Sequence, residues 1–257
     1  MKVAFVGKGG SGKSTIAGTF ARLLARTGEP VLALDSDPLP GLPYALGIEV
    51  DDTPIPDDAV VEGPEDGARW VLAPGLDPEL VIERYAPIGP DGVRYLQFGN
   101  TSGHISTIQK AQFAWSETVA GVDTDRWHLV GDLPGGTRQA MFGWAKYADH
   151  VLLVVEPTAK SLHSARRLLR LSEAVFAPET FSVVANKVQD DEDVDRIAAR
   201  LNRPVEIAIP LSPETLAGDR QGQAPLDADP EGTFVGAVES LVGSLLDMYA
   251  LDPKGAK

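Results

Sequence analysis

The sequence contains no cysteine, which excludes disulfide bridges, thiolate metal sites and cysteine-ligated iron–sulfur clusters. Basic residues are also scarce: 23 lysines and arginines stand against 37 aspartates and glutamates, giving a net charge of −14. An acidic protein repels phosphate backbones and anionic lipid headgroups. We therefore expect neither a nucleic acid nor a membrane surface as a partner.

Long apolar segments are missing as well. No apolar run approaches the roughly 20 residues needed to span a bilayer. The N-terminus enters a short apolar strand and a glycine loop, without the pattern of a signal peptide. The C-terminal stretch has one apolar helical stripe, but Glu239 and Asp247 stand where a lipid-binding helix carries basic residues. We expect this helix to dock onto a sheet, and the protein to be cytoplasmic.

Short, continuously apolar runs alternate with helical patterns along the 257 residues. Such runs are typical of parallel strands that helices cover on both sides. The pattern predicts an α/β fold with a mostly parallel central sheet and helices on both faces. The strongest strand candidates are residues 3–6, 31–34, 151–155 and 181–185, with 127–130 and 93–98 as further candidates.

Residues 50–68 interrupt this alternation. Seven acidic residues and three prolines in this segment predict an exposed, acidic connection. We interpret the chain as a single domain over residues 1–257 with an acidic surface insertion around 50–68.

A glycine loop follows the first apolar run. Gly7, Gly12, Lys13 and Ser14 satisfy the phosphate-binding P-loop pattern, with a strand before the loop and a helix after it. In such a loop, backbone N–H groups and the helix N-terminus bind phosphate, the lysine reaches the β- and γ-phosphates, and the hydroxyl ligates Mg²⁺. The nucleotide-binding residues predicted here are Gly9, Gly10, Ser11, Gly12, Lys13, Ser14 and Thr15.

A dinucleotide-binding fold is the main alternative for this loop. Gly7, Gly9 and Gly12 also spell G-x-G-x-x-G, and Asp35 ends the next strand, where such folds bind ribose. Lys13 and Ser14 have no role at that helix start, so the P-loop interpretation is favoured. Lys8 is then either a solvated loop residue or a second cation for the phosphates, from its own subunit or a partner.

The segment from Lys8 to Ser14 resembles the deviant Walker A motif of the MinD/ParA/nitrogenase iron protein class of P-loop ATPases. The resemblance covers most of the chain and implies the P-loop NTPase fold, ATP and Mg²⁺ as cofactors, and a homodimer when ATP is bound. In that class the early lysine crosses the dimer interface to the partner's nucleotide. Lys8 would then stabilise charge in trans, as an arginine finger does.

The same resemblance assigns roles to acids after two strands. The segment 35–38 resembles switch I, in which Asp37 positions or activates the attacking water and touches the Mg²⁺ shell, while Asp35 supports the loop or the metal shell. The segment 130–136 resembles Walker B and switch II. It implies that Asp132 holds Mg²⁺ through water, and that Gly135 or Gly136 meets the γ-phosphate through a backbone N–H.

For the base, Asn186 resembles the asparagine that reads the edge of adenine, and residues 207–211 resemble the loop that packs against it, with Pro210 in contact.

Among the branches of the class, the N-terminal half most resembles the CooC-type ATPases, which assist nickel insertion into carbon monoxide dehydrogenase. Those proteins carry a metal-binding Cys-x-Cys pair where this chain reads Gly103 to Ser106, with His104 but no cysteine. DNA-binding partition ATPases need a basic surface, and the only dense basic cluster is Arg166, Arg167 and Arg170, which reads as a solvated helix face.

We therefore predict a slow, partner-stimulated Mg²⁺-ATPase whose ATP-sandwich homodimer acts as a switch on an unidentified client protein. Two alternatives stay open. The chain could be a nucleotide-binding scaffold with little turnover. It could also be an ATP-dependent small-molecule enzyme, with residues 50–125 forming the substrate pocket.

Overall fold

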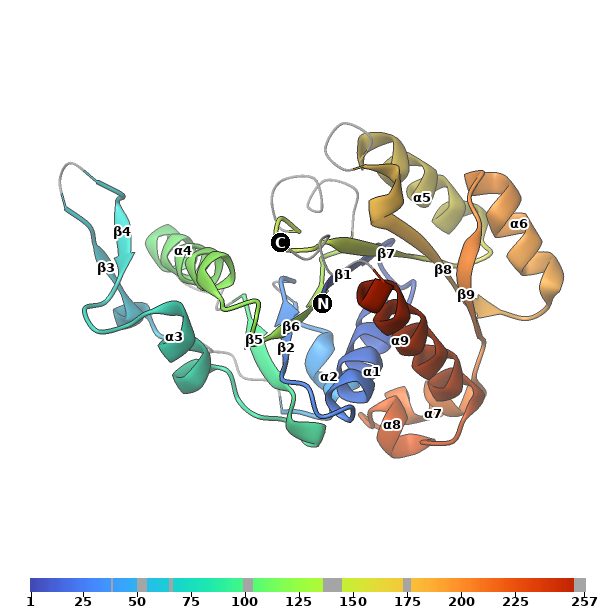
Figure 1. The fold of residues 1–257 in the computed structure, drawn as a ribbon, viewed down its shortest axis with the longest axis horizontal. Helices are drawn as coiled ribbons and strands as arrows, with labels where there is room; N and C mark the ends of the chain where they lie inside the picture. Colours follow the sequence, from blue (N-terminus) through green and yellow to red (C-terminus); the bar gives the residue numbers. More distant parts are fainter. Residues whose placement is uncertain are drawn as a thin grey trace.

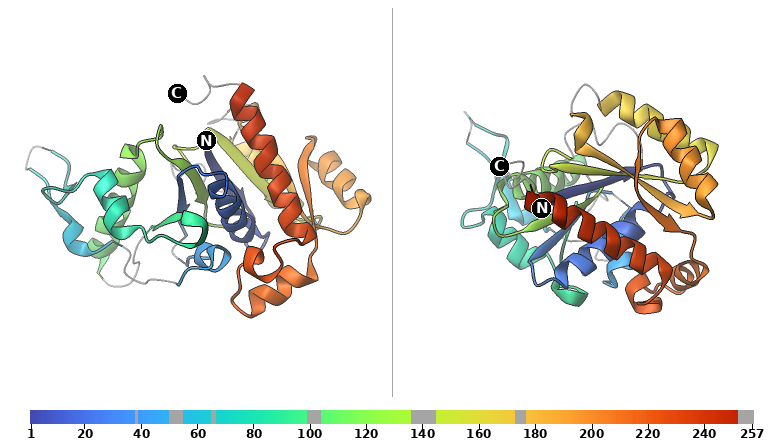
Figure 2. Two further views of the ribbon diagram at one scale, coloured as in Figure 1. Left: turned by 60° about the horizontal axis from the view of Figure 1, so that its bottom comes forward. Right: turned by 45° about the vertical axis from the view of Figure 1, so that its right-hand side comes forward.

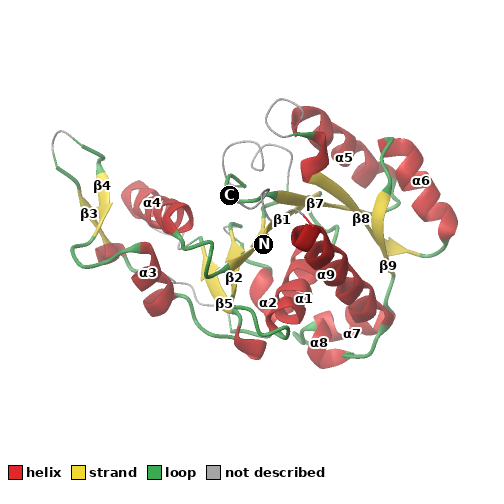
Figure 3. Cartoon of the chain, in the orientation of Figure 1, coloured by secondary structure: helices red, strands yellow, loops and turns green. Residues whose placement is uncertain are grey.

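A computed structural model describes residues 1–37, 39–49, 55–64, 67–98, 104–135, 145–172 and 177–251. Within these ranges seven strands form one sheet in the order β5-β2-β6-β1-β7-β8-β9, and every neighbouring pair is parallel (Figure 1, Figure 3). The predicted α/β fold is confirmed. The strands are β1 (Lys2–Gly7), β2 (Val31–Asp35), β5 (Arg94–Gln97), β6 (His128–Asp132), β7 (His150–Val155), β8 (Phe181–Val188) and β9 (Val205–Pro210).

Helices cover both faces of this sheet (Figure 2). One face carries α1 (Lys13–Ala25) and α9 (Thr233–Leu251), which contact each other. The other face carries α5 (Ala159–Ser172) and α6 (Asp191–Leu201) over one half, and α3 (Pro78–Tyr85) and α4 (Ile105–Gly121) over the other. Three short helices lie near the strand ends: α2 (Leu42–Leu46), α7 (Pro213–Arg220) and α8 (Pro225–Ala228).

The central strands form because their side chains alternate between two apolar cores. In β1, Val3 and Phe5 pack with α1 and α9, whereas Ala4 and Val6 pack with α5 and its neighbours. All four residues are at most 1% exposed. Burial on both faces explains why these segments are continuously apolar and do not alternate with polar residues.

The strand order determines where the sequence motifs meet. Because all strands of the sheet are parallel, their carboxyl ends lie along one edge, and β1 stands between β6 and β7. The loops that follow β1, β2, β6 and β8 therefore open at that same edge. Ligands of parallel α/β sheets bind outside the carboxyl ends of the strands.

The acidic segment differs from the prediction of an exposed connection. Its acids Asp57, Asp58 and Glu62 are exposed, but Ala59 and Val60 are buried in the core below α3 and α4. The segment contributes β3 (Val60–Glu62), which pairs antiparallel with β4 (Trp70–Leu72) in a separate hairpin that the sequence did not reveal. Residues 50–54, 65 and 66 lie outside the described residues, and the single-domain interpretation stays a prediction.

Helix α9 is longer and more apolar than expected. By length and composition alone, Thr233–Leu251 could cross a membrane, which corrects the statement that no apolar run comes close to that length. Its apolar side, however, packs into the core with α1, through Phe234, Val238, Leu241 and Leu245. Docking onto the sheet was the predicted role of this helix, and it is confirmed.

A buried arginine joins three distant parts of the chain. Arg22 in α1 is 3% exposed and bonds Asp91 at 2.7 Å and Asp227 of α8 through two bonds of 2.8 Å. Asp91 also accepts a bond from the exposed Arg26. These ionic hydrogen bonds offset the burial of the Arg22 guanidinium and raise its pKa, while the two arginines lower the pKa of Asp91.

Replacing Arg22 with alanine leaves Asp91 and Asp227 without their buried partner. We expect Arg22→Ala to lower the free energy of unfolding by about 3 kcal/mol, measured by urea titration. The matched control is Arg126→Ala, which breaks the partly exposed pair with Glu79 and should cost less than about 1 kcal/mol. Equal losses in the two variants would contradict a special role for Arg22.

Candidate functional site

The glycine loop connects β1 to α1 at the centre of the sheet edge. Gly12 stands at the N-cap position of α1 with φ 92°, and no side chain caps this helix end. The first N–H groups of an α-helix have no partner within the helix. An uncapped N-terminus with its partial positive charge is therefore suited to an anion.

Gly12 also allows another strand to approach the loop. The amide Nδ2 of Asn186, in β8, donates to the Ser11 carbonyl oxygen at 2.7 Å. A Cβ at Gly12 would lie 2.3 Å from that nitrogen. Glycine is needed here both for its left-handed φ and for this close approach.

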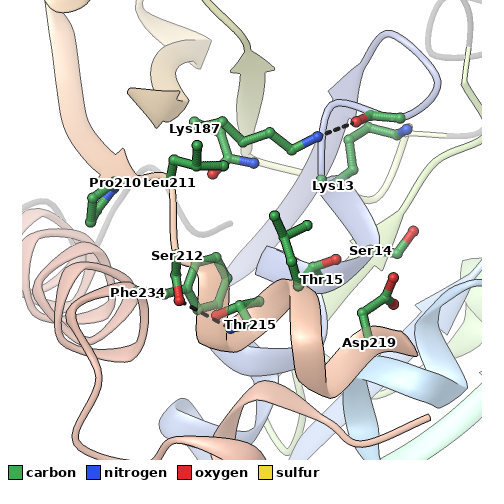
Figure 4. Close-up of a pocket in the computed structure, with 14 residues that line it drawn as sticks. Lys13, Ser14, Thr15, Lys187, Pro210, Leu211, Ser212, Thr215, Asp219 and Phe234 are labelled. Atoms are coloured by element: carbon green, nitrogen blue, oxygen red, sulfur yellow. Dashed lines mark hydrogen bonds between the residues drawn. The ribbon is translucent and has the colours of Figure 1, made fainter. Parts of the chain in front are cut away.

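A cavity of about 270 Å³ opens beside the loop (Figure 4). It brings together seven of the residues predicted from sequence: Gly10, Gly12, Lys13, Ser14, Thr15, Asn186 and Pro210. Leu211, from the segment predicted to pack against the base, also lines it, and the remaining wall comes from residues that the sequence analysis did not assign to a site: Lys187, Ser212, Thr215, Leu216, Asp219 and Phe234. Figure 4 shows Lys187 reaching across the cavity above Lys13, with Thr215 and Phe234 below.

The predicted base-contacting segment is in fact the edge strand of the sheet. Pro210 is the last residue of β9, and Leu211 donates its N–H to the Val188 carbonyl oxygen. Asn186 is 3% exposed, and its amide nitrogen is engaged by the loop. Its role in reading a base stays a prediction.

A second cavity, of about 200 Å³, lies beside the loop between Lys8, Gly135 and α5. Lys8 lines this cavity and not the first one, and its Nζ donates to the carbonyl oxygen of Gly9 at 3.1 Å. Gly9 lines the second cavity as well. The two lysines of the loop therefore border different cavities.

The predicted acids stand on neighbouring strands. Asp35 ends β2 and Asp132 ends β6, and the two are paired in register. Asp35 is fully buried and accepts the N–H groups of Asp37 and Leu42 at 2.9 and 3.1 Å. These bonds shape the loop after β2, so the predicted supporting role of Asp35 is confirmed. Asp37 is half-buried, and its Oδ1 accepts the N–H of Leu39 at 3.0 Å.

The buried carboxyl groups shift each other's ionisation. Burial, and then the charge of Asp132, raise the pKa of Asp35 above its usual value. Burial also raises the pKa of Asp132, against the opposing effects of Lys13 and of a hydrogen bond from Ser14. More positive charge at this point would stabilise both carboxylates.

The residues around Asp132 fit a magnesium ion. Oδ1 of Asp132 is buried and has no hydrogen-bond partner within the described residues, and the Ser14 hydroxyl lies within bonding distance of the same carboxylate. No cluster of three or more acidic or histidine side chains is present in the part of the chain that the structure describes. One carboxylate oxygen and one hydroxyl suit Mg²⁺, which takes one or two protein oxygens and completes its shell with water and phosphate.

Gly135 brings the loop after β6 against the glycine loop. A Cβ at Gly135 would lie 2.9 Å from the Gly9 Cα and 3.9 Å from the Lys13 Nζ. The backbone of residue 135 is therefore near the position expected for a terminal phosphate. Gly136, Pro38 and Gly103 lie outside the described residues, while His104 is exposed at the N-terminus of α4.

Comparisons with known proteins agree with the family resemblance and with the fold. The sequence profile of the CobQ/CobB/MinD/ParA nucleotide-binding domain family matches residues 3–226. The carbon monoxide dehydrogenase accessory protein CooC of Rhodospirillum rubrum is 28% identical, over 90% of this chain and 91% of that protein.

Two solved structures share the fold. A ParA family ATPase from Chlorobium tepidum TLS has a TM-score of 0.74 at 20% identity, covering 95% of this chain and 98% of its own. The septum site-determining protein MinD of Pyrococcus horikoshii OT3, complexed with Mg-ADP, has a TM-score of 0.71 at 19% identity and covers 98% of both chains.

Gly12→Ala tests the loop conformation. We expect ADP to bind roughly 10-fold more weakly or worse, because a left-handed φ alone costs an L-residue about 1–2 kcal/mol. The collision with Asn186 adds to this cost. Isothermal titration calorimetry measures the affinity, and Gly236→Ala in α9, where a Cβ meets open space, is the control. Unchanged ADP affinity in Gly12→Ala would contradict the phosphate-binding role of this loop.

Proposed function

We propose that this chain, which belongs to the CobQ/CobB/MinD/ParA nucleotide-binding domain family, is a Mg²⁺-dependent cytoplasmic ATPase. Two copies of this single P-loop domain enclose ATP, and the change from the ATP to the ADP state acts on a client protein. One observation carries the proposal: the uncapped N-terminus of α1 lies beside the unpartnered Asp132 oxygen. A triphosphate with its cation would complete both.

The first cavity supports a defined orientation of the nucleotide. Lys13 is 7% exposed and faces the phosphate end, where the N-terminus of α1 adds its partial charge. Pro210, Leu211 and Phe234 supply apolar surface at the other end of the wall, which suits a base. Phosphate therefore binds at the glycine loop, with the base toward β9.

Ser14 and Asp132 would hold the metal, and Asp37 would interact with it through water. Mg²⁺, when bound, neutralises negative charge on the β- and γ-phosphate oxygens. Lys13 provides a fixed cation beside the same oxygens, and it opposes the pKa rise of Asp132.

Asp37 orients the attacking water. Its carboxylate is half-buried, and its orientation is set by the Leu39 N–H, while its own N–H is fixed by Asp35. A carboxylate held in this way accepts a hydrogen bond from water and directs the water oxygen at the γ-phosphorus. Positioning is the main requirement, because phosphoryl transfer needs little covalent chemistry from the protein.

Lys8 acts on the nucleotide of the second copy. Its side chain borders the second cavity and folds back to the Gly9 carbonyl, so it does not engage the first cavity of its own chain. This geometry supports a role in trans. If a partner completes the site, turnover is expected to be slow in a monomer and ATP is expected to favour a dimer.

Asp37→Ala should abolish phosphate release while leaving ATP binding and the ATP-dependent dimer intact, because the variant loses the group that orients water but keeps the glycine loop, Lys13 and Ser14. Phosphate release and light scattering measure the two properties. Asp58→Ala, an exposed acid outside the site, is the control and should hydrolyse ATP like the unmodified chain. Normal turnover in Asp37→Ala would refute the assignment, and no turnover in the unmodified chain, with or without clients, would favour a nucleotide-binding scaffold.

Lys8→Ala should prevent the ATP-dependent dimer but largely spare nucleotide binding by the monomer. The expectation follows from the side chain's position outside its own nucleotide cavity. Analytical ultracentrifugation with a slowly hydrolysed ATP analogue reports the dimer, and Lys160→Ala on the exposed start of α5 is the matched lysine control. A dimer of undiminished stability in Lys8→Ala would exclude the role in trans.

A further inference from the structure

Lys187 has an unusual backbone conformation at the rim of the first cavity. Its φ is 58°, in the left-handed region that L-residues rarely adopt. The pairing of β8 with β9 is irregular at this position, between Asn186 and Val188. Such strained residues persist only where their surroundings hold them, and they gather at functional sites.

The strain has a geometric consequence. Successive side chains of a regular strand point to opposite faces of the sheet. At Lys187 this alternation is broken, and two consecutive residues of β8 reach the same loop. The Asn186 amide donates to the Ser11 carbonyl at 2.7 Å. The Lys187 Nζ donates to the Gly10 carbonyl at 2.9 Å, and Figure 4 draws this bond as a dashed line from Lys187.

A carboxylate fixes the other side of the ammonium group. Glu156, directly after β7, accepts a bond from the Lys187 Nζ at 2.7 Å. The Glu156 side chain is 15% exposed, and its backbone N–H donates to the Ser161 hydroxyl at the start of α5. Without this carboxylate, a lysine that is 35% exposed would be free to turn toward water.

Holding these two carbonyls affects the conformation in which the glycine loop can bind phosphate. The N–H and C=O groups of a peptide point in opposite directions. The peptide that carries the Gly10 carbonyl also carries the Ser11 N–H, which donates to the Lys8 carbonyl oxygen at 3.1 Å and closes a turn in the loop. Lys187 thus holds this turn from one side, and the Gly12 N–H, opposite the Ser11 carbonyl that Asn186 holds, points away from β8. A loop that already has this conformation loses less entropy when an anion binds.

We propose that Lys187 is a positioning residue of the nucleotide site, oriented by Glu156, which sets the conformation of the glycine loop before the phosphates arrive. The inference rests on the proposed function only in requiring that the site binds a nucleotide; hydrolysis and dimerisation are not needed. Two other roles for Lys187 are possible in principle and make different predictions. A surface ion pair would have no effect on nucleotide binding, and a lysine that contacts only the base would not act through the phosphates.

The test compares two ligands in binding assays without turnover. Lys187→Met removes the ammonium but keeps the stem and the left-handed residue, so the backbone strain is the same. We expect the Kd for ADP to rise about 10-fold, as for the loss of a charged hydrogen bond. The Kd for adenosine, which has no phosphate, should change less than about 2-fold, measured by ligand-observed NMR.

Two further variants separate positioning from folding. Lys187→Arg keeps a cationic donor and should restore most of the ADP affinity, while Glu156→Gln keeps the lysine and should weaken ADP binding in the same selective way. Lys160→Met is the matched control and should leave both constants unchanged. Unchanged ADP affinity in Lys187→Met, or an equal loss for ADP and adenosine, would overturn the proposal. A chain that binds ADP but never hydrolyses ATP would refute the proposed function and leave this inference standing.

Discussion

The site depends on one constraint: the turn from β1 into α1 must leave backbone N–H groups without protein partners. Unpaired N–H groups are costly when buried, so the loop has to be held by its other polar atoms. Here the carbonyls of Gly10 and Ser11 are held by Lys187 and Asn186 of β8. Glycine at position 12, with its left-handed φ, makes the close approach of β8 possible. The anion-binding character of the turn is therefore a property of two strands and a helix together.

The order of the strands provides the second half of the site. Since β6 lies between β1 and β2, the carboxylates of Asp35 and Asp132 end up side by side near Lys13 and Ser14. Burial in a region of low dielectric raises the pKa of both acids, and each carboxylate adds to the electrostatic cost of its neighbour. One buried lysine and one hydroxyl balance this charge only partly. A cation that binds together with a phosphate ligand would balance the remaining negative charge of the two carboxylates. Metal binding and nucleotide binding are therefore linked through electrostatics.

Much of the fold and the site could be predicted from local patterns. Continuous apolar runs identified β1, β2, β7 and β8, because strands buried on both faces leave little choice of residue. The edge strand β9 was taken for a loop, since an edge strand is covered less completely and its pattern is weaker. The acidic segment was expected to be exposed throughout, but Val60 is buried and only Glu62 is exposed in a three-residue strand that is too short to give a periodic signal.

By itself, the sequence determined the chemistry of the glycine loop, because Gly12, Lys13 and Ser14 act through positions that are neighbours along the chain. Only the tertiary structure decided what surrounds that loop. Lys187 meets Gly10 across 177 residues, and Arg22 meets Asp227 across 205. Such pairs form because of strand order and of the packing of helices onto the sheet. No local spacing encodes these contacts, since the entropy of closing so long a loop is offset only by the whole core. The tertiary structure also determines that Lys8 borders a different cavity from Lys13.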